Sequence, residues 1–244
     1  MSLLWQLDGG AEMTKVLRKL LTVFAKRNSN TFVHYLRKQG AQIGKNTTFI
    51  NTRHASVDSG RIKYLSIGDN CVICSGVSFI MHDYSWYVLG NAYQELFPSG
   101  GQPISIGSNV FIGANSLVLG NTKIGDNVIV AAGSVVKGNL ASDMIYGGNP
   151  AKPIMSLADY RQHRKERCIE DAKSEVRYYR DHFGRDPKPG EMMNYAVLFK
   201  DMKERVNDTT LGFEQGYYKN LCRTISSPYE TYDIFLKSYK ASNI

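Results

Sequence analysis

A single histidine, His82, is the strongest candidate for chemistry in this chain of 244 residues. It stands beside Asp83, at the start of a segment rich in aromatic residues. Imidazole titrates near neutral pH, so His82 suits the removal of a proton from a substrate. A loop histidine that only bonds a backbone carbonyl is the alternative. Neighbouring side chains of an extended segment point to opposite faces, so Asp83 either orients His82 or shapes the turn.

Residues 84–103 form the aromatic segment after His82, and they include Trp86 and Tyr87. We predict a long loop that projects from the fold, and such loops are often functional. Trp86 and Tyr87 either line a substrate site or anchor the loop, and the sequence favours neither. His54 is a further candidate for substrate binding, with a structural role as the favoured alternative.

The elements that position these side chains follow a six-residue period. A branched aliphatic residue recurs at that spacing: Ile106, Ile112, Val118, Ile124, Val130 and Val136. A small residue follows most of them, and a second inward residue comes four positions later, from Val110 to Leu140. Side chains on one face of a helix recur at about 3.6 residues, and those on one face of a flat strand recur at about two. A period of six instead indicates a parallel β-helix, in which a tight turn follows each short strand.

The pattern divides the chain into three segments. Residues 1–40 are predicted to form an N-terminal helical cap, with an amphipathic helix over 11–27. Residues 41–154 form the β-helix, so the fold class is mainly β. Residues 155–244 are predicted to be a C-terminal helical extension that covers the open end of the solenoid.

Within that extension, turn and capping signals predict three helices. Ser156 with Asp159 resembles a capping box at the start of the first helix. A second helix is predicted over 191–204. Ser227 followed by Pro228 predicts the start of a third.

The net charge of +8 is concentrated at the N-terminus, since the first 45 residues hold eight Lys/Arg and two Asp/Glu. This argues against a nucleic-acid-binding face. The basic helix over 11–27 is predicted to pack on the solenoid, and contact with an anionic membrane surface is the alternative. There is no run of about 18 apolar residues and no secretory leader pattern. We therefore expect a cytoplasmic protein, with membrane association on the cytoplasmic face as the alternative.

The four cysteines predict neither a disulfide framework nor a metal site. Cys71 and Cys74 form a C-x-x-C pair, but no second pair exists to complete four zinc ligands. Cys71 also occupies an inward position of its hexad. We expect no metal.

The repeats resemble those of the hexapeptide-repeat acyltransferases over roughly residues 41–154. The resemblance is carried by Ile106-Gly107-Ser108-Asn109-Val110, Ile124-Gly125-Asp126-Asn127, Ala132-Gly133-Ser134-Val135-Val136 and Gly148-Asn149-Pro150-Ala151-Lys152. It implies a left-handed parallel β-helix and a homotrimer with active sites between neighbouring solenoids. It also implies acetyl-CoA as co-substrate and a sugar-like acceptor. The helical tail is similar to that of polysaccharide-biosynthesis and xenobiotic acetyltransferases.

The resemblance also assigns roles to residues. It places His82 as the general base. It places Ala114 and Ala132 against the pantetheine arm of CoA, and Lys137 and Lys152 near its phosphates. The alternative is that the alanines only form corners and that the lysines are solvated. Phe111 stands where many relatives have Trp, which leaves the packing of the cofactor open.

The expected activity is acetyl-CoA-dependent O-acetylation of a sugar hydroxyl of a surface polysaccharide or its precursor. N-acetylation of an amino sugar or xenobiotic is the alternative within the enzyme class. A non-enzymatic β-solenoid scaffold is the alternative outside it. A zinc hydratase of the γ-carbonic anhydrase type needs three histidine ligands, whereas only His54 and His82 lie in the repeats.

Overall fold

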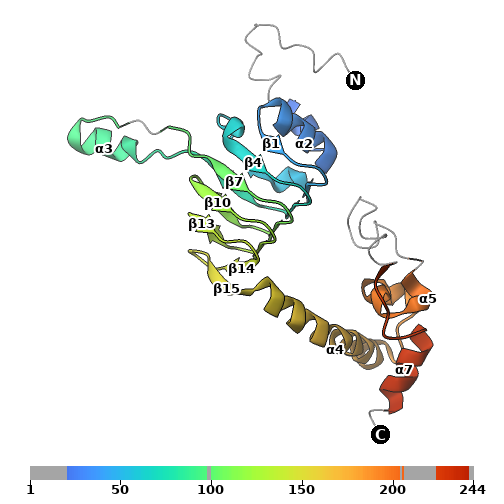
Figure 1. The fold of residues 1–244 in the computed structure, drawn as a ribbon. Helices are drawn as coiled ribbons and strands as arrows, with labels where there is room; N and C mark the ends of the chain where they lie inside the picture. The colour runs from blue at the N-terminus through green and yellow to red at the C-terminus, as the bar shows by residue number, and fades with distance from the viewer. Residues whose placement is uncertain (1–20, 98–99, 204, 206–223, 242–244) are drawn as a thin grey trace. The chain divides into compact units, whose positions relative to one another are not determined.

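The computed structural model describes residues 21–97, 100–203, 205 and 224–241 (Figure 1). The chain divides between Ala158 and Asp159 into two compact units, each described here by itself. No helix in the described ranges is both long and apolar enough to cross a membrane.

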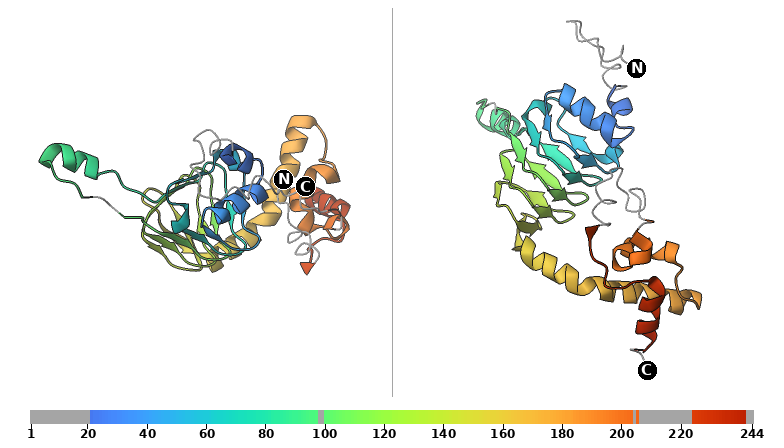
Figure 2. Two further views of the ribbon diagram at one scale, coloured as in Figure 1. Left: turned by 90° about the horizontal axis from the view of Figure 1, so that it is seen from above. Right: turned by 45° about the vertical axis from the view of Figure 1, so that its right-hand side comes forward.

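The first unit is built from three sheets that the chain visits in turn, coil after coil (Figures 1 and 2). The first sheet contains β1 (Gln42–Ile43), β4 (Leu65–Ile67), β7 (Ile104–Ile106), β10 (Thr122–Ile124) and β13 (Asn139–Leu140). The second contains β2 (Thr48–Phe49), β5 (Val72–Ile73), β8 (Phe111–Ile112), β11 (Ile129–Val130), β14 (Met144–Gly147) and β15 (Lys152–Ser156). The third contains β3 (Ser56–Val57), β6 (Ser78–Ile80), β9 (Leu117–Leu119) and β12 (Val135–Val136). All neighbours pair in parallel except β14 and β15.

The six-residue period fills the interior of these coils, as the sequence predicts. Ile106 pairs with Ile124, an offset of 18 residues, so three hexads make one coil. The six aliphatic residues of the period are all at most 3% exposed. The second inward positions are buried as well, including Ser116 and Ser134, whose hydroxyls donate to the carbonyl of Ala131. The prediction of the core is therefore confirmed.

Close stacking at one corner explains why glycine follows the aliphatic residue. A Cβ on Gly68 would lie 2.6 Å from the carbonyl carbon of Gly107 in the next coil. Asparagines occupy the left-handed turn positions beside this stack, such as Asn109 at φ 57. Their side chains form a ladder: Asn109 donates to Asn127 at 2.8 Å, and Asn127 donates to Asp143 at 2.9 Å. These residues hold successive coils in register.

Helix α2 (Ser29–Lys38) covers the first coil. Asn28 and Thr31 form its capping box, and Phe32 meets Phe49 edge-on at 5.1 Å between ring centroids. Of the helix predicted over 11–27, residues 21–25 are helical and residues 11–20 lie outside the described residues. The ammonium of Lys26 donates to the carbonyl of Ala55 at 2.6 Å. This basic residue therefore packs on the solenoid.

Residues 84–97 and 100–103 leave the coil as a projecting arm (Figure 1). The arm differs from the predicted loop because it contains a helix, α3 (Trp86–Tyr93), in which no residue is buried. Aromatic and glycine residues are weak helix formers, so the sequence gives little local signal for it. The two stems are held together where the amide of Gln102 donates to the carbonyl of Met81 at 3.2 Å.

The described part of the second unit is largely helical. It contains most of α4 (Leu157–Phe183), the 3-10 segment η4 (Pro189–Leu198), α5 (Lys200–Lys203) and α7 (Tyr232–Ala241). Its core gathers Ala172, Val176, Phe199 and Phe235, all fully buried.

Two helix predictions in this unit need correction. The helix expected over 191–204 is the 3-10 segment η4 followed by the short α5. The helix expected from Ser227 begins only at Tyr232. Ser227 donates its hydroxyl proton to the carbonyl of Val197 at 2.8 Å. A tertiary contact has therefore replaced the helix cap that the local sequence suggests.

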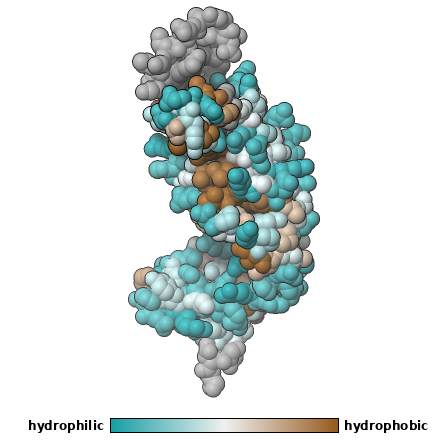
Figure 3. Space-filling view, turned by 90° about the vertical axis from the view of Figure 1, so that its left-hand side faces the viewer, coloured by the Kyte–Doolittle hydropathy of each residue, from teal (hydrophilic) through white to brown (hydrophobic). Residues whose placement is uncertain are grey.

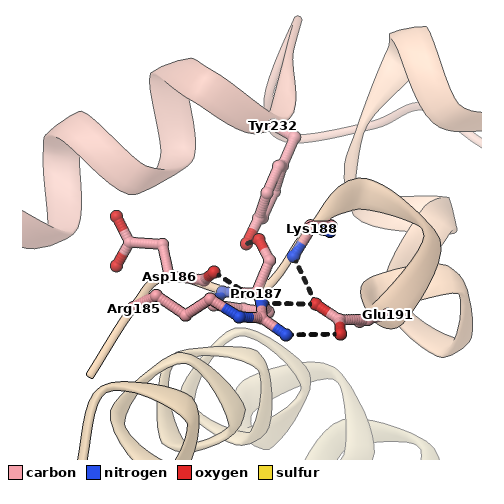
Figure 4. Close-up of polar contacts among 6 residues, drawn as sticks. All are labelled: Arg185, Asp186, Pro187, Lys188, Glu191 and Tyr232. Atoms are coloured by element: carbon pink, nitrogen blue, oxygen red, sulfur yellow. Dashed lines mark hydrogen bonds and ion pairs between the residues drawn. The ribbon is translucent and has the colours of Figure 1, made fainter. Parts of the chain in front are cut away.

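The turn after α4 is fixed by charge (Figure 4). The guanidinium of Arg185 forms two hydrogen bonds of 2.8 Å with the carboxylate of Glu191, which also accepts from the amide of Lys188 at 2.7 Å. These donors lower the pKa of Glu191 from its ordinary 4.5 to about 2. The hydroxyl of Tyr232 donates to the carbonyl of Pro187 at 2.9 Å, and burial raises the pKa of Tyr232.

Candidate active site

His82 lies just beyond the end of β6, where the third sheet leads into the arm. Its Nδ1 is 2.5 Å from Oδ2 of Asp58, and the two side chains are 27% and 12% exposed. A carboxylate accepts hydrogen bonds, so the proton of the neutral imidazole resides on Nδ1. Nε2 then carries a lone pair that is available to a substrate.

Asp58 is the partner of His82 that the sequence analysis missed. It follows β3, and β3 pairs with β6 so that Val57 lies opposite Phe79. The amide of Asp58 donates to the carbonyl of Phe79 at 3.2 Å, which brings Asp58 to the same corner as His82. The six-residue period does not identify Asp58, because this coil departs from the period. It contains two 3-10 turns, η2 (Thr52–His54) and η3 (Ile62–Tyr64).

Arg61 gives the Asp58 carboxylate a cationic neighbour. Its Nε is 3.8 Å from Oδ2 of Asp58. Its amide also donates to the carbonyl of Asp58 at 3.0 Å, which closes the turn between the two residues. The corner therefore places an imidazole, a carboxylate and a guanidinium in series.

Asp83 shapes the turn, while the contact with the imidazole of His82 is made by Asp58. Oδ1 of Asp83 accepts from the amide of Ser85 at 2.7 Å. Hydrogen bonds from Ser85, and then the charges of His82 and Lys137, lower the pKa of Asp83. Its exposed carboxylate therefore remains ionised and fixes the start of the arm.

A row of aromatic rings runs from His82 onto the arm. The ring of Tyr84 is 4.5 Å from that of His82, measured between centroids. Trp86 lies 6.3 Å from Tyr84, and Tyr87 lies 6.5 Å from Trp86. Apolar surface is visible on the side of the molecule from which the arm projects (Figure 3). Successive ring contacts therefore connect Tyr87 to Trp86, Trp86 to Tyr84, and Tyr84 to His82.

The four residues predicted for CoA are spread over one chain, and Lys137 is the one placed at the same edge of the third sheet as His82. Ala114 and Ala132 precede β9 and β12, at the edge of the third sheet opposite His82. Lys137 follows β12, at the same edge as His82, and is exposed. Lys152 is exposed at the start of β15. In a single chain, Ala114 and Ala132 therefore lie at the start of the strands of the third sheet, and His82 and Lys137 lie at the end of these strands.

The other predicted residues take up varied positions. His54 is exposed in η2, before β3, and so lies away from His82 along the third sheet. Phe111 faces outward on β8 and is 39% exposed.

Cys71 is buried and is a free thiol, and its Sγ donates to the carbonyl of Gly107 at 3.2 Å. Burial raises the pKa of Cys71 and of Cys74. Among the described residues, no three potential metal ligands cluster.

Comparisons with known proteins define the family. Residues 103–138 match the family described as bacterial transferase hexapeptide (six repeats), and residues 65–78 match the hexapeptide repeat of succinyl-transferase. The chain is 39% identical over 145 residues to Protein CapG of Staphylococcus aureus. The aligned residues cover 59% of this chain and 81% of that protein. The chain belongs to the hexapeptide-repeat acyltransferase family, and its enzyme class is acyltransferase.

Solved structures of acetyltransferases are also similar to this chain. Soybean serine acetyltransferase is 29% identical, with a TM-score of 0.38, over 47% of this chain and 40% of that chain. A hexapeptide-repeat acetyltransferase of Vibrio cholerae is 20% identical, with a TM-score of 0.44, over 64% of this chain and 99% of that chain. The match thus spans less than half the length of the soybean enzyme.

Proposed function

We propose that the protein is an acetyl-CoA-dependent O-acetyltransferase that acts on a sugar hydroxyl of a surface polysaccharide or its precursor. The observation that carries this proposal is the hydrogen bond between His82 and Asp58, beside a row of aromatic rings. It supplies an oriented base within a family of acyltransferases.

His82 acts as the general base. Nε2 takes the proton of the acceptor hydroxyl as its oxygen attacks the thioester carbonyl of acetyl-CoA. Asp58 holds the ring by Nδ1 and stabilises the imidazolium that forms. Backbone amides at a coil corner donate to the tetrahedral oxyanion. When the intermediate collapses, the carbon–sulfur bond breaks, the CoA thiolate leaves, and His82 returns the proton to it.

The corner that precedes the third sheet suits acetyl-CoA. Ala132 is exposed, and no atom lies within 4 Å of the position that a Cβ on Gly133 would occupy. Small side chains there leave the backbone open to the pantetheine arm. The exposed ammonium groups of Lys137 and Lys152 supply charge for the phosphates.

The proposal includes a homotrimer of left-handed β-helices with the active site between two copies. Its support is the separation of His82 from Ala114 and Ala132 on opposite edges of the third sheet. In the trimer, the edge of one copy that carries His82 faces the edge of the next copy that carries Ala114 and Ala132. One acetyl-CoA then contacts both edges.

The test is a CoA-release assay with the full chain over a panel of sugars, nucleotide sugars, polysaccharide fragments and aminated drugs. Mass spectrometry identifies the acetylated product. Mild alkali then distinguishes an ester, which it removes, from an amide, which it leaves. An alkali-labile product on a sugar supports the proposal. Transfer to amines only, or CoA release that does not depend on an acceptor, contradicts it.

A further inference from the structure

We infer that the acceptor is a chain of several sugar residues, held along the row formed by Tyr84, Trp86 and Tyr87. This inference rests on the proposed function and names the form of its acceptor. It assigns Tyr84 to the sugar that reacts and Tyr87 to a sugar further along the chain.

The geometry of the row supports this assignment. Successive rings are separated by 4.5, 6.3 and 6.5 Å, starting from His82. The last two contacts are edge-to-face, the arrangement that aromatic pairs prefer. Tyr84 is 63% exposed and Tyr87 is 66% exposed, so their faces are open to a ligand.

The base of the row is held at the corner that carries His82. The carboxylate of Asp83 binds the amide of Ser85, and the stems of the arm are joined between Met81 and Gln102. Gly101 lies against the ring of Tyr64, where a Cβ would approach to 2.0 Å. A ligand that contacts the row is therefore positioned with respect to Nε2 of His82.

The chemistry of the arm indicates the class of ligand. The apolar face of a pyranose ring stacks on an aromatic ring, and the spacing of the row is comparable to the length of one sugar residue. A monosaccharide with its hydroxyl at Nε2 contacts Tyr84, whereas contact with Tyr87 requires a longer chain. Helix α3 contains no charged residue. It therefore suits a neutral saccharide better than a phosphate-bearing one.

The experiment compares kcat/KM for the mono-, di- and tetrasaccharide of the best acceptor, with acetyl-CoA saturating. We expect kcat/KM to rise with chain length in the unmodified protein. We take the loss of one stacking contact to be comparable to the loss of an aromatic pair, which corresponds to about twofold to tenfold. Tyr87→Ala should lower kcat/KM by that factor for the tetrasaccharide and leave the monosaccharide unchanged. Tyr93→Ala, on the same arm and 70% exposed, is the matched control and should leave both unchanged.

Three results overturn the inference. Equal kcat/KM for all lengths shows that the acceptor is a single sugar. An equal loss on all lengths in Tyr87→Ala shows that Tyr87 acts on the arm itself. A change in sedimentation mass in Tyr87→Ala shows that the row contacts a second copy. These outcomes differ from failure of the proposed function, in which no saccharide of any length is acetylated.

Discussion

Replacement of Asp58 by asparagine tests the proposed catalytic corner without changing its shape. In the protein, Oδ2 of Asp58 accepts the Nδ1 proton of His82 at 2.5 Å. An asparagine amide in the same place can present its N–H to Nδ1. That arrangement favours the tautomer with the proton on Nε2, which then has no lone pair for the acceptor hydroxyl.

The size of the effect follows from the role of the base. General base catalysis contributes about 10²- to 10⁴-fold. The equivalent change in serine proteases, a worked example from another fold, costs about 10⁴-fold. We therefore expect Asp58→Asn to lower kcat/KM by about 10²- to 10⁴-fold, or about 3 to 5 kcal/mol of transition-state stabilisation. Stability should change by no more than about 1 kcal/mol, because asparagine keeps a hydrogen bond to His82 and the ion pair with Arg61 is long and partly exposed.

The assay measures initial rates of acetyl transfer to the best acceptor, with a thermal melt of each variant as the control for folding. Asp83→Asn is the matched control, because it removes a carboxylate next to His82 but keeps an oxygen for the amide of Ser85. Its rate should stay within about twofold. The reasoning is refuted if Asp58→Asn keeps the rate of the unmodified protein, or if both substitutions lower it equally.

Three further substitutions test the fold. Gly68→Ala places a Cβ 2.6 Å from the carbonyl carbon of Gly107, and overpacking of this kind should lower the free energy of unfolding by about 1–3 kcal/mol. In Gly100→Ala the new Cβ meets no atom within 4 Å, so this variant should unfold in urea like the unmodified protein. An equal loss of unfolding free energy in both variants would contradict the close stacking at Gly68. The lowered pKa of Glu191 means that its contribution to stability is present above pH 4.5 and is lost as the pH falls towards about 2. Melting temperatures of the unmodified protein and Glu191→Gln should therefore differ at pH 6 and converge near pH 2, whereas a constant difference would contradict the pairing with Arg185.

The core could be predicted because burial in this fold follows a local period. Each inward position, such as Ile112 or Val130, is set by its place in a hexad, and the sheets follow from stacking equal coils. No long-range contact had to be guessed. The family resemblance rests on the same local pattern.

Asp58 could not be found in this way because its coil departs from the period. Ser56 pairs with Ser78 at an offset of 22 residues, whereas Ile106 pairs with Ile124 at an offset of 18. The longer offset includes the 3-10 turn η3, which no hexad describes. The partner of His82 is therefore set by strand pairing, which a single sequence does not show.

The remaining differences arise from tertiary contacts. The helix start predicted at Ser227 is replaced by a hydrogen bond to Val197, which is distant in sequence. Of the residues predicted for CoA, Ala114 and Ala132 precede strands of the third sheet, Lys137 follows one, and Lys152 starts β15 of the second sheet. Sequence patterns identify such residues but do not show how far apart they lie in the folded chain.

If His82 is the base of an acetyltransferase, replacing it must remove most of the activity of a folded protein. Acetyl transfer to the best acceptor is compared among the unmodified protein, His82→Ala and His54→Ala, with a melt of each. His82→Ala should lower kcat by about 10²-fold or more, while His54→Ala, which changes an exposed histidine elsewhere in the coils, should stay within about twofold. Full activity of a folded His82→Ala variant would show that His82 is not the base.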